Sequence, residues 1–259
     1  SRGKRAIALP APITYSVLPH TRYTQQLASL AHKEGKQVML HLPMSNLNRI
    51  APGPGALTAS LEKSEFLHVL ATAINDIPNV SGINNHMGSS LTQKAVQMSW
   101  LMKEIKNQGL FFIDSRTTEK SIATNIARLH RVKSSSRDVF LDHQPDAKAI
   151  DMAFRKLISL AHKKGTAIAI GHPHLATLSY LEKALPTLRE EGIEIVQVSE
   201  LVELQGSRFA RVKAIASAKS SVPSYMARPV ITPTIPPSTR ASISSNAATS
   251  PISFTPPEA

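Results

Sequence analysis

The sequence contains no cysteine, which excludes disulfide bonds, thiolate metal sites and a cysteine nucleophile. Aromatic residues make up only 5% of the 259 residues, so Ala, Ile, Leu and Val must form most of any core. No apolar run approaches the roughly 20 residues of a membrane-spanning helix. No apolar segment follows the basic residues 1–5 and there is no initiator Met, so we see no export signal and expect a processed chain or a fragment.

The formal net charge is +12 and the isoelectric point is near 10.1, which permits nucleic acid or an anionic surface as a partner. The body of the chain, however, shows no run of Lys and Arg, no basic helix face and no aromatic residues interleaved with basic ones. The sequence therefore argues against a nucleic-acid-binding protein. That reading would predict a DNA affinity that falls steeply with salt.

Residues 1–205 alternate between short apolar runs and segments of helical periodicity. The predicted strands are residues 13–18, 38–42, 80–84, 110–114, 139–142, 167–172 and 193–198, and the predicted helices are residues 22–34, 62–77, 93–108, 120–129, 146–164 and 176–191. About seven β–α repeats with continuous apolar strands are typical of a parallel sheet, either closed into a barrel or open. No glycine-rich phosphate loop follows any strand, so a dinucleotide fold gains no support.

Residues 206–259 form a second region with a different composition. They hold eight of the 18 prolines, many Ser, Thr and Ala residues, and six basic residues against Glu258 alone. No helical or strand period is present, and such a segment buries too little apolar surface to offset chain entropy. We predict a disordered basic tail after a folded domain at residues 1–205.

Chemically reactive side chains gather where the predicted strands end. These residues are His41, His86, Asp114, Asp142, and His172 with His174. Because the carboxyl ends of parallel strands meet at one rim, these side chains are expected to converge there. Neutral imidazoles and a carboxylate suit a bound divalent ion such as Zn²⁺, with further His or Asp groups as general acid and base.

Each of these residues also has a structural interpretation. A lone His at a strand end is more often a hydrogen-bonded structural residue than a ligand. Asp114 could cap the following helix, Arg116 could form a structural pair with Asp142, and His172 could pack under the sheet. The coincidence of several independent strand ends favours a hydrolase site at the rim.

Five elements carry a resemblance to a known family. They are residues 41–44 (His-Leu-Pro-Met), 82–89 (Gly-Ile-Asn-Asn-His-Met-Gly-Ser), 111–118 (Phe-Phe-Ile-Asp-Ser-Arg-Thr-Thr), 139–142 (Val-Phe-Leu-Asp) and 168–174 (Ile-Ala-Ile-Gly-His-Pro-His). In this order and spacing, residues 6–204 closely resemble the divergent polysaccharide deacetylases. The resemblance implies an α/β fold, a distorted (β/α) barrel of about seven parallel strands.

The family resemblance also implies roles for individual residues. His41 and His86 become candidate ligands of a divalent metal, with Zn²⁺ the leading candidate. His172 becomes the candidate catalytic acid, and Asp114 a further catalytic candidate. The remaining residues, Asn85, Arg116, His174 and Asp142, would line the substrate pocket.

Family members open with an apolar strand that ends in an Asp-Asp motif, just upstream of residues 5–10. This chain begins after that strand and has no other Asp-Asp pair. We therefore expect the first barrel strand to be missing and this chain to be a poor enzyme. The implied function is metal-dependent hydrolysis of an N-acyl group on a glycan of the periplasm or cell envelope. The alternative is a non-catalytic envelope protein that binds glycan or cell-wall partners.

Overall fold

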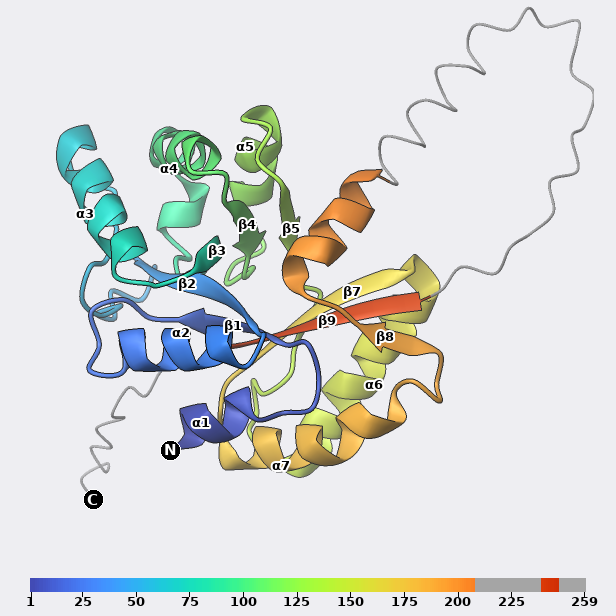
Figure 1. Cartoon of the computed structure of the whole chain (residues 1–259). Coiled ribbons are helices and arrows are strands. Elements are labelled where there is room, and N and C mark those ends of the chain that lie inside the picture. The colour runs from blue at the N-terminus through green and yellow to red at the C-terminus, as the bar shows by residue number, and fades with distance from the viewer. Residues whose placement is uncertain (208–238, 247–259) are drawn as a thin grey trace, which may run out of the picture.

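The computed structural model describes residues 1–207 and 239–246, and it shows an all-parallel β-sheet with helices packed outside it (Figure 1). The strands are β1 (Thr14–Val17), β2 (Gln37–Met44), β3 (Val80–Met87), β4 (Phe111–Asp114), β5 (Ser134–Ser136), β6 (Val139–Phe140), β7 (Thr166–Gly171), β8 (Ile193–Ile195) and β9 (Thr239–Asn246). Each predicted strand segment overlaps one of these strands. The three-residue β5 and the eight-residue β9 were not predicted.

The strands lie in the order β5-β4-β3-β2-β1-β9-β7-β6, with β8 paired to β9 outside this path. This parallel α/β architecture agrees with the predicted fold class. The sheet has nine strands, rather than about seven. No ladder joins β5 to β6 within residues 1–207 and 239–246, so a closed barrel stays a prediction.

Most helices follow the predicted segments, with shorter ends. They are α1 (Arg2–Ile7), α2 (Thr24–Lys33), α3 (Lys63–Asn75), α4 (Ala95–Asn107), α5 (Ala123–Leu129), α6 (Ala147–Lys164) and α7 (Leu175–Ala184), with 3₁₀ turns η1 (Leu91–Gln93) and η2 (Leu185–Thr187). In α6 the Asp146 carboxylate accepts from two backbone N–H groups at the start, and Gly165 ends the helix at φ +78°. A further helix, unpredicted, begins at residue 198 and is described as far as residue 207.

The sheet is apolar on both faces, because alternate residues of each strand point to opposite sides. In β2, Val38, Leu40 and Leu42 join the large core that the outer helices cover. Met39 belongs instead to a second cluster on the inner face, with residues of β4, β7 and the segment 196–202. By the same alternation, His41 lies on the inner face with Met39. The strand period thus directs His41 away from the helical layer.

Residues 239–246 depart from the expectation for the tail. They form β9, which pairs in parallel with β1, β7 and β8. Without β9, the facing edges of β1 and β7 would expose unpaired backbone N–H and C=O groups. A strand can pair with both edges through its main chain alone, so it needs no apolar sequence pattern. The rest of the predicted tail, residues 208–238 and 247–259, lies outside the described residues.

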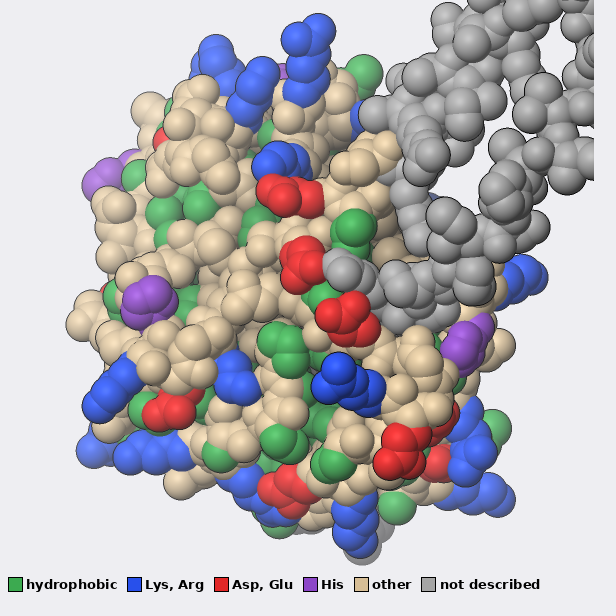
Figure 2. Space-filling model, turned by 45° about the vertical axis from the view of Figure 1, so that its right-hand side comes forward, with side chains coloured by type: hydrophobic (Ala, Val, Ile, Leu, Met, Phe, Trp, Pro, Cys, Tyr) green, Lys and Arg blue, Asp and Glu red, His purple; other side chains and the backbone are tan. Residues whose placement is uncertain are grey.

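The surface shows acidic side chains standing among the Lys and Arg residues on the face drawn in Figure 2. Two ion pairs illustrate this mixture, Arg5 with Glu182 and Lys133 with Glu203. Among the described residues, none of the helices combines the length and apolar character needed to cross a membrane.

Candidate functional site

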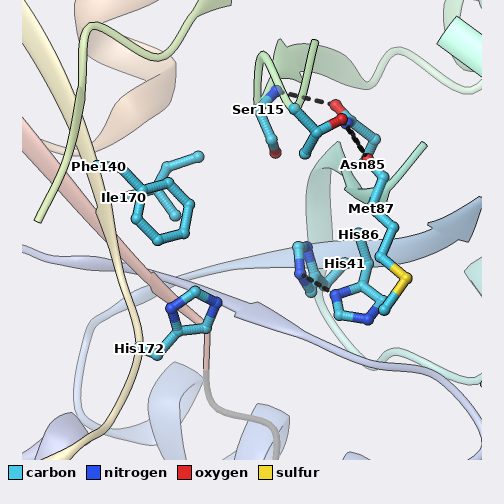
Figure 3. Close-up of a pocket in the computed structure, with 9 residues that line it drawn as sticks. His41, Asn85, His86, Met87, Ser115, Phe140, Ile170 and His172 are labelled. Carbon is cyan, nitrogen blue, oxygen red and sulfur yellow. Dashed lines mark hydrogen bonds between the residues drawn. The ribbon is translucent and has the colours of Figure 1, made fainter. Parts of the chain in front are cut away.

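A pocket of about 200 Å³ lies on the inner side of the sheet, at the carboxyl ends of β2, β3, β4 and β7 (Figure 3). Its lining residues come from these strands, from β6 and from the loop after β4: His41, Asn85, His86, Met87, Ser115, Thr117, Phe140, Ile170 and His172. The three predicted histidines His41, His86 and His172 therefore meet in one place. This position agrees with the rule that ligands bind at the carboxyl ends of parallel strands.

His41 is held in the pocket wall by a fixed hydrogen bond. Its side chain is 3% exposed, and its Nδ1 lies 2.9 Å from Oδ1 of Asn84, the residue opposite it in the β2–β3 register. An amide oxygen can only accept, so Nδ1 of His41 carries the proton and Nε2 presents a lone pair. The Ser16 hydroxyl donates to the same amide oxygen. Such outer contacts are typical of a metal-ligating imidazole.

His86 stands beside His41, with its Nδ1 3.0 Å from Nε2 of His41 and the rings in an edge arrangement. A tetrahedral Zn²⁺ with bonds of about 2.0–2.1 Å places two nitrogen ligands about 3.3 Å apart. The observed separation is close to that value. Burial lowers the pKa of His86 to about 4, and burial followed by the nearby His86 lowers the pKa of His41 well below its ordinary value. Both rings are therefore neutral at pH 7, as metal ligands must be.

His172 faces these two rings from the opposite wall of the pocket (Figure 3). Its Nδ1 lies 3.1 Å from Oδ1 of Asp142, and its backbone N–H donates to Oδ2 of Asp142 at 2.5 Å. The Thr177 hydroxyl also donates to Oδ2, at 2.9 Å. Burial raises the pKa of Asp142, but the hydrogen bonds from His172 and Thr177 outweigh it and leave the pKa below its ordinary value. Asp142 thus orients His172 so that Nε2 is the nitrogen left for the pocket.

Four of the predicted site residues do not line this pocket: Asp114, Arg116, Asp142 and His174. Asp114 is fully buried at the end of β4, where it accepts from the Arg116 backbone N–H at 2.8 Å and from the Ser121 hydroxyl at 2.7 Å. These contacts make it a local turn residue. It is not the helix cap that the sequence left open, because the N-cap of α5 is Ile122. The structure brings Asp142 together with His172 rather than with Arg116. The Arg116 side chain is exposed, and its backbone carbonyl accepts from Arg137.

The predicted substrate-binding residues Asn85 and His174 lie near the catalytic candidates. Asn85 lines the pocket, although its amide donates to the Met87 carbonyl at 2.7 Å and its oxygen accepts from the Ser115 backbone at 2.8 Å. Met87 adopts a positive φ of 54°, a conformation that costs free energy in a non-glycine residue and that these contacts hold in place. The His174 ring lies 5.7 Å from that of His172, between centroids, outside the pocket lining.

A second group of potential metal ligands overlaps this site. One ligand atom each from Asp142, His172 and His174 lies within 4.8 Å of the others. Both carboxylate oxygens of Asp142, however, already accept hydrogen bonds from His172 and Thr177. An ion here would have to displace those bonds. Between His41 and His86 it would replace one hydrogen bond, which Nδ1 of His86 donates to Nε2 of His41, and the His86 proton would move to Nε2.

Several pocket residues were not singled out from the sequence as site residues. They are Met87, Ser115, Thr117, Phe140 and Ile170. All five lie inside the quoted motifs, and Met87, Ser115 and Thr117 follow His86 or Asp114 within three residues, so their proximity to the rim was a usable signal. The sequence identifies Phe140 and Ile170 only as apolar residues of predicted strands. The strand pattern does not show which face of the sheet lines a pocket.

Most of the described fold matches one protein family. The family described as divergent polysaccharide deacetylase matches residues 1–202. The chain therefore belongs to the divergent polysaccharide deacetylase family, and the resemblance seen in the motifs is confirmed.

Its relatives have names that state no activity. The chain is 34% identical over 198 residues to the uncharacterized protein YibQ of Escherichia coli K12, covering 76% of this chain and 62% of that protein. It is 33% identical over 194 residues to an uncharacterized protein of Haemophilus influenzae, covering 75% of this chain and 69% of that one. A crystal structure of the uncharacterized protein ATU2773 from Agrobacterium tumefaciens C58 is similar with a TM-score of 0.75 and 25% identity, over 77% of this chain and 82% of that one. The chain thus spans less than two thirds of the length of the Escherichia coli relative.

Proposed function

We propose that this protein provides the metal-binding and acid–base groups of a hydrolase that removes an N-acyl group from a sugar of a cell-envelope glycan. The observation that carries the proposal is the convergence of three imidazoles on one pocket, with Nε2 of His41 and Nδ1 of His86 3.0 Å apart. Membership of the divergent polysaccharide deacetylase family supports a glycan as the substrate.

The donor set fits a divalent ion of the Zn²⁺ type. His41 and His86 would hold it, because their facing nitrogens are neutral and Asn84 fixes the ring of His41. A bound ion would polarise the acyl carbonyl and lower the pKa of a bound water. No Asp or Glu is among the nine lining residues, all of which are described.

His172 supplies the proton transfer in this proposal. Its Nδ1 is committed to Asp142, so Nε2 is the atom that would exchange a proton with the leaving amine. Asp142 keeps the ring oriented, and stabilises it when it becomes positively charged. Phe140 packs against the His172 ring with centroids 5.3 Å apart and limits the access of water on that side.

The first experiment measures metal content and Zn²⁺ affinity of the full chain beside the variants His41→Ala and His86→Ala. We expect about one ion per chain, and a loss of at least tenfold in affinity in either variant. His162→Ala is the matched control, because His162 is exposed on α6 and is not among the lining residues of the pocket. Wild-type protein that binds no metal, or variants that bind it as tightly as the control, would contradict the metal site.

A second experiment separates catalysis from binding. Release of acetate from an N-acetylated chito-oligosaccharide is measured for the wild type and for His172→Gln, which keeps the polar character but not the acid–base function. We expect release to fall at least a hundredfold in His172→Gln. Binding of the oligosaccharide to metal-loaded wild type without any release would instead favour the non-catalytic glycan-binding role.

A further inference from the structure

A second hollow adjoins the pocket and has a different chemical character. It has a volume of about 300 Å³, and it shares two lining residues, His86 and Met87, with the pocket described above. The two hollows therefore adjoin at these two side chains.

The second hollow is an apolar groove. Most of its wall comes from the end of β2 and the loops after β1 and β2: Pro43, Pro19, Ala51, Pro52, Gly53 and Pro54. Thr21 and His86 supply the only polar side chains among its ten lining residues, and none of the ten is Phe, Tyr or Trp. A sugar ring in this groove would leave most hydroxyl groups without partners and would have no aromatic face to stack on. A hydrocarbon chain would meet neither cost.

The loop that forms the groove is held in one conformation. Leu57 is fully buried, donating its backbone N–H to Pro43 and accepting from Ser45, both at 2.9 Å. The Asn46 side chain bonds the backbone of Ile50 in both directions, at 2.6 and 3.1 Å. A groove that is already formed loses little conformational entropy when a ligand enters it.

Apolar surface continues beyond the groove on the same loop. Leu47 and Ile50 are 61% and 55% exposed, which places them among the few large apolar side chains that the described surface exposes. Both precede the groove residue Ala51 on this loop. A chain too long for the groove could therefore continue over these two side chains.

From the position of the groove beside the pocket and its apolar lining we infer that the groove binds the acyl chain of the substrate, and that the preferred substrate is a sugar N-acylated with a chain longer than acetyl. The inference rests on the proposed function, since it takes the pocket between the imidazoles to be the place of the amide group. The carbonyl carbon would then lie near His86, and the methylenes would follow the proline-lined wall away from it. Each fully buried methylene contributes up to about fourfold in affinity.

Calorimetric titration of the full chain with N-acetyl-D-glucosamine and with monomeric N-octanoyl-D-glucosamine tests the inference. We expect the octanoyl sugar to bind at least tenfold more tightly, because the open groove buries only part of each methylene. Ala51 is exposed and lines the groove, so Ala51→Phe should fill it and bring the ratio of the two affinities to about three or less. Ala147→Phe, at an exposed position outside both hollows, is the matched control and should keep the wild-type ratio.

Equal affinities of the two sugars would overturn the inference, as would a preference for octanoyl that Ala51→Phe leaves unchanged. Absence of measurable binding of both sugars would also overturn it. Thermal melting of each variant checks that the fold is kept. These outcomes do not depend on turnover, whereas loss of metal in His86→Ala tests the proposed function by itself. Failure of the acyl groove and failure of the metal site are therefore distinguishable.

Discussion

Asp142 accepts three hydrogen bonds through a fully buried side chain, and replacing it by Asn keeps the shape while changing which bonds can form. An Asn oxygen in the place of Oδ2 can still accept from the His172 backbone and from the Thr177 hydroxyl. The Asn NH₂ group then faces Nδ1 of His172. Nδ1 carries the ring proton in the wild type, so two hydrogen-bond donors would face each other. The imidazole must give up that contact or move its proton to Nε2.

The expected cost follows from the bond that is lost. A hydrogen bond to a charged group contributes about 1.5–3 kcal/mol, so we expect Asp142→Asn to lower the free energy of unfolding by about 2 kcal/mol. For a domain of this size that corresponds to a fall in Tm of about 4–8 °C. Urea denaturation at pH 7 measures it. Asp146→Asn is the matched control, because Asn and Asp serve equally well as the N-cap that Asp146 provides for α6.

The pH dependence gives an independent check with a definite sign. The folded pKa of Asp142 lies below its ordinary value, so its stabilisation is complete above about pH 4 and is lost as the pH falls through the folded pKa. The difference between wild type and Asp142→Asn should therefore shrink below pH 4. Nitrogen-15 NMR of the ring should also show the His172 proton moving from Nδ1 to Nε2 in the variant. A cost no larger than that of Asp146→Asn, with an unchanged tautomer, would refute this account of Asp142.

Three further predictions concern other parts of the structure. In protein freed of metal by a chelator, NMR should show His86 neutral down to about pH 4. This folded pKa lies below the unfolded value near 6.5, so the free energy of unfolding should decline as the pH falls from about 6.5 to about 4. Gly82→Ala should destabilise by about 1–3 kcal/mol in urea denaturation, because the added Cβ would lie 2.4 Å from the Phe111 ring; a neutral result would mean that the ring moves freely. Ser242→Pro removes a backbone donor from β9, which pairs with both β1 and β7, and should cost about 3 kcal/mol. Ser242→Ala, which keeps the N–H group, is its control, and equal stability of the two would place residue 242 outside the ladder.

The sequence predicted the parts of the site that depend on periodicity. His41 and His86 end apolar segments, and the alternation of β2 directs His41 to the inner face with Met39. Asp114 follows the same pattern, yet it is not in the pocket, because the nearby Ser121 and the Arg116 backbone occupy its carboxylate. Whether a polar residue at a strand end turns to the pocket or to its own loop depends on such local partners, which the strand pattern does not encode.

The position of β9 could not be predicted for a different reason. The sequence of residues 239–246 is rich in Ser and lacks a clear alternation, so its place in the sheet depends on the backbone edges of β1 and β7 rather than on its own pattern. That place bears on the site, because Asn246 pairs with Ser16 in the register of β1, and the Ser16 hydroxyl donates to the Asn84 oxygen that holds His41. If β9 supports the site, Ser242→Pro should shift the NMR signals of the His41 ring as well as lower stability. If only stability falls, β1 to β4 alone hold the His41 ring in place. In that case β9 closes the gap between β1 and β7 in the sheet but does not support the site.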